Sequence, residues 1–278
     1  MSDIARKKSF FATIGDEIKA LERVETDRVL PSGKPIIARM DGRSFHTFTK
    51  GMPRPYHEPM SSAMMETTKW LVGNTNADVG YTQSDEITLV FLPAGERSKN
   101  DAFFGLRVHK LVSVLAALAT SKFMFEVAQR MPDKTGEYPV FDSRVFVVPD
   151  IKRATYAVLF RALDCEKNAV SSAAHAVFGH KAILGKNTHE RQKMLKEVGY
   201  DWDNLPQFFK NGATYTRVAI MRNLTDVELA RIPEDHWPDG PVLRNEIKEC
   251  DLPPLSKIRN LTETLFYGAE PELRNPIR

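Results

Sequence analysis

Residues 36–48, IIARMDGRSFHTF, join an apolar strand pattern to an acidic turn. The run from Ile36 to Met40 is of strand type, and Asp41 and Gly42 follow where the apolar residues stop. A lone Asp-Gly is most often only a turn. A second stretch at 79–91, VGYTQSDEITLVF, places two acidic residues at the edge of another β-branched run. Carboxylates on neighbouring strands can share hard cations such as Mg²⁺, so the two stretches together predict an acidic site.

The segments between and after these stretches predict an α+β fold. A helical pattern at 60–72 joins the first strand to a hairpin at 79–91 that carries its acids at the bend. The longest helix is expected at 103–130, and a strand at 140–148 follows. The order β, α, β, β, α, β predicts the ferredoxin-like plan, an antiparallel sheet with helices on one face.

The flanking segments predict additions to this plan. An amphipathic helix is expected over 3–28, a largely helical segment over 152–178, and a helix that starts near Thr188 with a cap at Asn187 or Thr188. Residues 207–217 predict a turn into a strand, and the residues after 217 show weak periodicity. We therefore expect a catalytic domain at 1–150 and, at 151–278, a helical and β extension that belongs to the same catalytic unit.

Composition excludes several classes of protein. The chain has 278 residues, of which 27% are charged and 42% hydrophobic, and its formal charge of +3 permits a polyanionic partner without requiring one. Cys165 and Cys250 are far apart, which argues against a disulfide framework or a zinc site. A reducing, cytoplasmic location is expected. We find no window as apolar as a membrane span and expect no membrane contact.

The quoted motifs, taken in order, resemble those of the tRNA-histidine guanylyltransferase superfamily, including its guanylyltransferase-like members in bacteria, archaea and phages. MDGRSFHTF and YTQSDE are followed by FFGLRVHKLVSVLAALATSKF, FDSRVFVVP, RALDCEKN, LGK and FFKNGATY. The resemblance covers approximately residues 5–220. Several motifs in one order are more specific than any one of them.

The resemblance implies a polymerase-type palm that adds nucleotides in the 3′ to 5′ direction to the 5′ end of a tRNA. The enzyme would activate that end with ATP and then add a nucleotide from GTP or another nucleoside triphosphate. Two Mg²⁺ ions would be held by Asp41, the carbonyl of Gly42, and Asp85, with Glu86 assisting as a third catalytic residue. Paired metals of this kind clamp the attacking and leaving oxygens of phosphoryl transfer.

The same resemblance implies two further sets of residues and an assembly. The nucleotide is expected to contact Gly42, Arg43, Ser44, Phe45, His46, Arg54, Ser84, Arg107 and Lys110. The tRNA or its 5′ phosphate is expected to contact Arg161, Asp164, Asn168, Lys186 and Lys210. A homo-oligomer, typically a tetramer, is implied, with the C-terminal part contacting tRNA and forming the oligomer.

One motif departs from the family. Eukaryotic members that add an untemplated guanosine carry His-Ile-Asn-Asn after the cysteine of this region, whereas this chain has Cys165-Glu166-Lys167-Asn168-Ala169. A glutamate cannot replace an imidazole near a phosphate, so template-directed repair of 5′-shortened tRNAs is expected instead. Two alternatives are another palm enzyme such as a nucleotide cyclase, and a catalytically inactive RNA-binding homologue.

Overall fold

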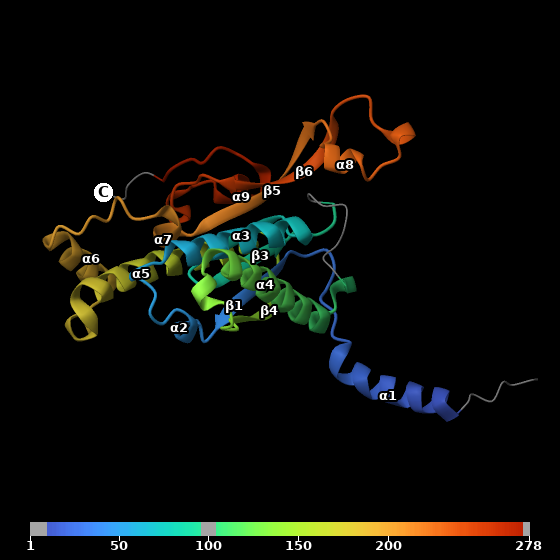
Figure 1. Cartoon of the computed structure of the whole chain (residues 1–278), viewed down its shortest axis with the longest axis horizontal. Helices are drawn as coiled ribbons and strands as arrows, with labels where there is room; N and C mark the ends of the chain where they lie inside the picture. The colour runs from blue at the N-terminus through green and yellow to red at the C-terminus, as the bar shows by residue number, and fades with distance from the viewer. Residues whose placement is uncertain (1–9, 96–103, 275–278) are drawn as a thin grey trace, which may run out of the picture.

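A six-stranded antiparallel sheet forms the centre of the molecule. The computed structural model describes residues 10–95 and 104–274. The strands lie in the order β4-β1-β3-β2-β5-β6 (Figure 1). Their bounds are β1 Ile36–Arg43, β2 Val79–Gln83, β3 Glu86–Phe91, β4 Val140–Val147, β5 Ala213–Arg222 and β6 Val242–Cys250. The helices are α1 Phe10–Thr26, α2 Phe45–Phe48, α3 Glu58–Asn74, α4 Val108–Arg130, α5 Ile151–Ile183, α6 Thr188–Glu197, α7 Gln207–Asn211, α8 Asp226–Leu229 and α9 Leu261–Tyr267.

The ferredoxin-like plan is confirmed in strands β1 to β4. They are antiparallel neighbours in the order β4-β1-β3-β2, and α3 and α4 pack on one face. Ile36, Ala38 and Met40 alternate along β1 and point into the core beneath these helices. In the sequence, apolar residues recur every second position in the strands and about every 3.6 positions in the helices. These are the residues that form the interface between the sheet and the two helices.

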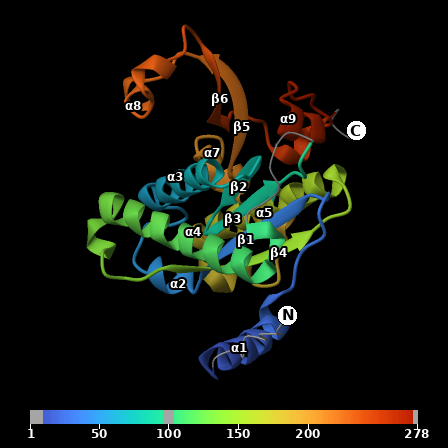
Figure 2. The same ribbon diagram turned by 90° about the vertical axis from the view of Figure 1, so that its right-hand side faces the viewer.

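The opposite face of the sheet is also covered by helices, which the sequence did not predict. Ala154, Val158 and Ala162 on α5 pack with Ile37 of β1 and with residues of β2, β3 and α9. Figure 2 shows α5 behind the sheet and α3 and α4 in front of it. Small alanines allow α5 to lie close to the strands, and the sheet is therefore a buried middle layer near its centre.

The relative lengths of the two long helices differ from the prediction. α5 has 33 residues and α4 has 23, so the segment that begins near 103 does not form the longest helix. Phe104, Gly105 and Leu106 have φ of 58°, 57° and 61°. These left-handed conformations are incompatible with an α-helix. α4 therefore begins only at Val108, and residues 101–103 lie outside the described part.

α4 corrects the expectation about membrane spans. By length and composition this helix could cross a membrane, contrary to our sequence reading. In the structure, Leu111, Leu115 and Phe123 of α4 are fully buried in the core beneath the sheet. That arrangement is the one that a core helix of a globular domain adopts.

The second half of the chain extends the sheet. β5 pairs with β2 and β6 pairs with β5, all antiparallel. The predicted turn at 207–217 becomes the short helix α7 followed by β5, and the weakly periodic tail forms α8, β6 and α9. β6 gave no clear pattern because it is an edge strand whose residues are half-buried or exposed. The helix predicted from Thr188 is confirmed, with a capping box between Asn187 and Glu190.

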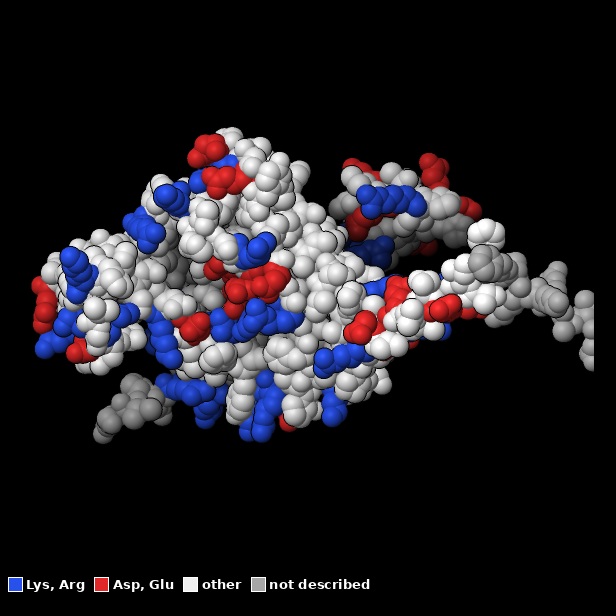
Figure 3. Space-filling view, turned by 90° about the horizontal axis from the view of Figure 1, so that it is seen from below, with Lys and Arg blue, Asp and Glu red and all other residues white. Residues whose placement is uncertain are grey.

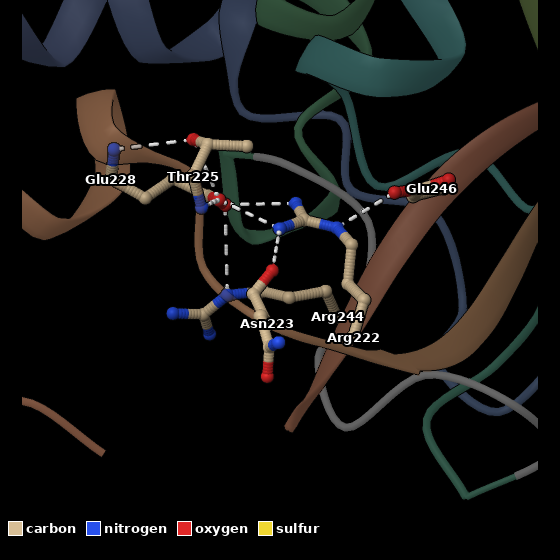
Figure 4. Close-up of polar contacts among 6 residues, drawn as sticks. All are labelled: Arg222, Asn223, Thr225, Glu228, Arg244 and Glu246. Carbon is tan, nitrogen blue, oxygen red and sulfur yellow. Dashed lines mark hydrogen bonds and ion pairs between the residues drawn. The ribbon is translucent and has the colours of Figure 1, made fainter. Parts of the chain in front are cut away.

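The outer part of β5 and β6, together with α8, forms an arm that projects from the body (Figure 1). Arg222 on β5 links the three elements of this arm through hydrogen bonds to α8 and β6. Its guanidinium donates to Glu228 at 2.7 and 3.0 Å and to Glu246 at 2.7 Å (Figure 4). Thr225 and Glu228 also form the capping box of α8.

The opening helix lies away from the rest of the molecule. Of the helix predicted over 3–28, the structure gives α1 at Phe10–Thr26, and residues 3–9 lie outside the described part. Figures 1 and 2 show α1 projecting below the sheet. Ile14, Ile18, Leu21 and Val24 are 42%, 57%, 62% and 79% exposed, so the apolar face predicted for this helix is not buried within the chain.

Candidate active site

Three carboxylates lie in a row across the sheet. Asp41 on β1 is opposite Glu86 on β3 and opposite Asp142 on β4. Directly paired residues of antiparallel strands share a face, and Asp41 shares its face with Ile37, which packs toward α5. A view from below shows acidic side chains gathered near its middle with basic side chains beside them (Figure 3).

Asp85 joins this row from the turn between β2 and β3. Ser84 has a φ of 49°, which gives the chain the left-handed bend of a two-residue hairpin. The Gly42 N–H donates to the Asp85 carbonyl at 3.0 Å and so ties the end of β1 to this turn. Burial raises the pKa of Asp85, and the charge of Asp41 raises it further. The predicted acidic bend is confirmed, and it places two carboxylates close together.

Glu86 is held by arginines. Its side chain is 6% exposed and accepts a hydrogen bond from Arg161 Nε at 2.5 Å, while Arg39 lies 3.9 Å from its other oxygen. Burial raises the pKa of Glu86 although Arg161 opposes this effect. Glu86 is therefore paired with arginine side chains, whereas no such ion pair is formed by Asp41 or Asp85 among the described residues.

Asp41 and Asp85 have the chemistry of a divalent-cation site. Among the described residues neither forms an ion pair, and no cluster of three or more His, Cys, Asp and Glu side chains could hold a metal in that part of the chain. A cation would therefore use these two carboxylates with backbone carbonyl and ligand oxygens. Mg²⁺ is commonly bound by one or two carboxylates and phosphate oxygens, so the donor set fits it.

A cavity of about 430 Å³ opens beside Asp85. Six residues expected to bind nucleotide, metal or tRNA line it: Phe45, His46, Arg54, Ser84, Asp85 and Asn168. Its far wall includes Tyr56 and Phe209, whose rings lie 5.4 Å apart. Cys165 also lines it, and burial raises the pKa of this thiol to about 12, so the thiol stays protonated. The cavity has the size and polarity of a nucleotide site.

The turn after Asp41 is shaped by close packing. A Cβ at Gly42 would lie 2.4 Å from the Phe45 ring, so only glycine fits there. Phe45 is 3% exposed and its ring lies 5.5 Å from Phe48 and 5.1 Å from Phe141. Ser44, with φ of 56°, begins α2 in a left-handed conformation. The aromatic anchor therefore fixes the backbone amides of this turn next to Asp41.

The predicted nucleotide contacts are divided between two hollows. Arg43 and Ser44 line a separate hollow of about 620 Å³ with Lys50 and Lys134, whereas His46 and Arg54 face the cavity beside Asp85. The left-handed Ser44 turns the chain between the two. A single nucleotide in the cavity beside Asp85 would therefore meet His46 and Arg54 rather than the side chains of Arg43 and Ser44.

Arg107 and Lys110, predicted to contact the nucleotide, lie far from Asp41 within one chain. Just before them, the Leu106 carbonyl accepts a hydrogen bond from the Leu30 N–H at 2.9 Å, in the segment that leads into β1, whereas Asp41 lies near the end of β1. Figure 1 shows the beginning of α4 at the opposite end of the molecule from α2. The two residues do share the exposed start of α4, but helical spacing could not reveal at which end of the sheet that start lies.

The residues predicted to contact tRNA lie in three different places: on α5, in the turn between α5 and α6, and on α7. Arg161 donates to Asp164 at 3.0 Å as well as to Glu86, and the Asn168 amide lies 3.5 Å from Asp164, so α5 presents a polar edge to the site. Lys186 lies at the turn between α5 and α6. The Lys210 ammonium is engaged by the Trp202 and Asp203 carbonyls at 3.5 and 2.9 Å. Within one chain, Lys210 thus contributes to the loop before α7, and its predicted contact with phosphate stays a prediction.

Some site residues escaped the sequence reading. Asp142 lies in the predicted strand within FDSRVFVVP. Only the register of β4 against β1 shows that it is paired with Asp41. Tyr56, in the loop before α3, and Phe209, on α7, meet across the cavity although they are 153 residues apart in the chain. Pairings at this sequence distance leave no local signal.

Comparisons with known proteins agree with this geometry. A family model described as tRNA-His guanylyltransferase matches residues 16–149. The chain is 24% identical to the tRNA(His) guanylyltransferase of Schizosaccharomyces pombe over 81% of this chain and 95% of that protein. A bacterial tRNA(His) guanylyltransferase-like protein solved with ATP is 29% identical with a TM-score of 0.73, covering 91% of this chain and 99% of the other. The structure of such a protein with GTP is 27% identical with a TM-score of 0.69, covering 92% and 99%. The chain belongs to the tRNA-histidine guanylyltransferase superfamily, whose members are nucleotidyltransferases.

Proposed function

We propose that this protein adds nucleotides in the 3′ to 5′ direction to the 5′ end of a tRNA, after activating that end with ATP. The observation that carries the proposal is the Asp41–Asp85 pair, of which Asp85 lines the 430 Å³ cavity. Phosphoryl transfer needs acidic residues that position cations on the phosphates, and a binding protein without catalysis would gain nothing from carboxylates that repel RNA. ATP and GTP, or another nucleoside triphosphate, are the proposed substrates.

We propose Mg²⁺ as the cofactor, with two ions held by Asp41, the Gly42 carbonyl and Asp85. When bound, the metal would neutralise phosphate charge and stabilise the attacking and leaving oxygens. Gly42 and Asp85 are already tied by the 3.0 Å backbone hydrogen bond, so two of the three proposed ligands are positioned relative to each other.

The other cavity residues have roles that follow from their chemistry. The backbone amides after Gly42 donate hydrogen bonds to phosphate oxygens, while the Ser84 hydroxyl donates to Asp85 Oδ1 at 3.1 Å and so orients that carboxylate. Arg54 supplies positive charge at the same cavity, which His46 also lines. Arg161, fixed by Glu86 at 2.5 Å, orients the polar edge of α5 toward the incoming 5′ end.

We propose that addition is directed by the template. Glu166 stands where the family has a histidine, and its carboxylate accepts a hydrogen bond from Ser256 at 2.6 Å. This contact directs the side chain to the C-terminal segment, and Glu166 is not among the residues that line the 430 Å³ cavity. No imidazole is therefore available at this position for an untemplated reaction.

The test is a competition between a 5′-monophosphorylated tRNA lacking its first nucleotide and a full-length histidine tRNA. Each is incubated with Mg²⁺, ATP and the other three triphosphates. We expect faster addition to the shortened tRNA, with the base complementary to the acceptor strand. Preference for the full-length histidine tRNA, with guanosine added opposite a non-complementary base, would refute templated addition. Release of cyclic nucleotide without RNA labelling would refute the transferase itself.

We further propose that the chain acts in the cytoplasm as a homo-oligomer, with tetramer the expected state, and that residues 151–278 contribute tRNA contacts. The exposed apolar face of α1 supports the assembly. Ile18 and Leu21 are more than half exposed, and apolar side chains spaced along one helix face ordinarily find a partner.

A further inference from the structure

A second hollow lies next to the catalytic cavity, at the junction of α5 and α6. It has a volume of about 340 Å³, and it shares Arg54 and Ser172 with the catalytic cavity. Figure 1 shows α6 at the far end of α5, beyond the part of α5 that crosses the sheet. A chain that ends in the catalytic cavity could therefore continue into this hollow.

The hollow is lined by positive and neutral polar groups. Its polar residues are Arg54, Ser171, Ser172, His175, His180 and Arg191. No Asp or Glu is among the lining residues of the described chain. Glu190, the acidic neighbour of Arg191 in sequence, accepts the Asn187 N–H at 2.6 Å in the capping box of α6. The described lining of this hollow therefore carries the positive charges of Arg54 and Arg191 and contains no carboxylate.

Two hydrogen bonds hold Arg191 in place and leave other N–H donors of its guanidinium unused. Its guanidinium donates to the Ser171 hydroxyl at 2.7 Å and to the Ile183 carbonyl at 3.4 Å. Its Nε is buried and has no hydrogen-bond partner among the described residues. A fixed guanidinium with an unused donor is preorganised for an oxyanion, because little side-chain entropy is lost on binding.

The two histidines reach the hollow because α5 is kinked. Gly179 has φ of 75° and ψ of 167°, which interrupts the helix between them. The His175 and His180 rings lie 6.2 Å apart as a result. In a continuous helix, residues five apart would point in different directions. The kink therefore gathers both imidazoles on one hollow.

We infer that this hollow binds a backbone phosphate of the tRNA strand that enters the catalytic cavity, an inference that rests on the proposed function. A phosphodiester presents two anionic oxygens, which match the guanidinium donors, the hydroxyls and the imidazoles. The triphosphate of the nucleotide belongs beside Asp41 and Asp85, in the neighbouring cavity. The shared residue Arg54 then separates the nucleotide from the next phosphate of the RNA.

The test compares His180→Asp with His189→Asp. Both histidines are exposed, but His189 lies on α6 outside the hollow, so the pair is matched in residue type and charge change. Arg191→Gln is a second variant, since it removes the guanidinium. The dissociation constants of a 5′-monophosphorylated tRNA and of ATP are measured by fluorescence anisotropy and calorimetry at several salt concentrations. Circular dichroism confirms folding.

We expect His180→Asp and Arg191→Gln to weaken tRNA binding about tenfold, and Arg191→Gln to lower the salt slope by about 1. ATP binding should stay within about twofold, as should tRNA binding by His189→Asp. Equal tRNA affinity of the two aspartate variants overturns the proposal. Weaker ATP binding with unchanged tRNA binding also overturns it, because the hollow would then hold the nucleotide.

The experiments distinguish failure of the proposed reaction from failure of the proposed phosphate site. If the wild-type protein binds tRNA but adds no nucleotide, the proposed reaction is refuted while the binding comparison still tests the hollow. If the wild-type protein adds nucleotides and the aspartate variants bind tRNA equally, only the hollow is refuted. Absence of any tRNA binding by the wild type refutes both.

Discussion

At the scale of single residues, the site depends on which carboxylates have an arginine as an ion-pair partner. Glu86 has Arg161 and Arg39, whereas Asp41 and Asp85 have no ion-pair partner among the described residues. Burial raises the pKa of Asp85. A bound cation would reduce the electrostatic repulsion between Asp41 and Asp85, which have no arginine partner. Glu86, which has one, holds Arg161 in place.

We expect Asp41→Ala and Asp85→Ala each to reduce nucleotide addition at least about 100-fold, because loss of one ligand removes the electrostatic stabilisation of the transition state. Single-turnover rates on 5′-shortened tRNA measure the effect, and thermal melting checks the fold. Asp226→Ala, which removes an exposed carboxylate on α8, is the matched control and should be unchanged. Folded Asp41 or Asp85 variants with near-normal rates would refute the metal assignment.

Arg161→Ala should destabilise the fold by about 3 kcal/mol, because it leaves the buried Glu86 with only the more distant Arg39, at 3.9 Å, as a charge partner. The Arg161 and Glu86 side chains are 14% and 6% exposed. Arg153→Ala on the same helix breaks an ion pair whose side chains are 52% and 51% exposed, and it should cost less than about 1 kcal/mol. Urea unfolding of the two variants gives the comparison, and equal losses would contradict this account.

At the scale of elements, close approaches of backbone hold the layers together. A Cβ at Gly80 of β2 would lie 2.4 Å from Val72 of α3, whereas one at Gly73 of α3 would meet only Ile247 at 3.5 Å. The first is an overlap and the second an ordinary contact. The interface between α3 and the sheet therefore needs glycine on the strand but not on the helix.

Gly80→Ala is expected to lower the free energy of unfolding by about 1–3 kcal/mol through this overlap. Gly73→Ala should be neutral or should stabilise by up to about 1 kcal/mol, since alanine favours helix. Chemical denaturation monitored by circular dichroism measures both. A stable Gly80→Ala variant would show that α3 can move away from β2 at little cost.

The arm formed by β5, β6 and α8 should respond to acid. The hydrogen bond from Arg222 lowers the pKa of Glu228 to about 2. Because the folded pKa is below the usual value near 4.5, the pair stabilises the arm above about pH 4.5, and this contribution is lost as the pH falls toward 2. Melting temperatures of wild type and Glu228→Gln should therefore differ at pH 6 and converge near pH 2. A constant difference across this range would contradict the assignment.

At the scale of the whole molecule, two segments leave the body. α1 and the β5–β6 arm both project in Figure 1. The body has its own core between α3, α4 and the sheet and a second core beneath α5. The apolar face of α1 contributes to neither core, and this exposure is the observation behind the proposed assembly of several copies.

Ile18→Glu combined with Leu21→Glu should lower the oligomeric state measured by light scattering after size exclusion, because two charges replace the apolar face of α1. The exposed Lys19→Glu variant of the same helix tests whether charge alone has this effect, and it should keep the wild-type mass. An unchanged mass for the double variant would exclude α1 from the interface.

The sequence by itself determined the α+β class, the ferredoxin-like order of β1 to β4 and the acidic turns at Asp41 and Asp85. Each of these follows from local periodicity or from a short motif. Only the tertiary structure decided that Arg161 pairs with Glu86, that Lys210 donates to the Asp203 carbonyl, and that the start of α4 lies far from Asp41. The tertiary structure also decided that α5 packs on the second face of the sheet and that β6 forms its edge strand. These features depend on strand register and on contacts between residues many positions apart, which no local pattern encodes.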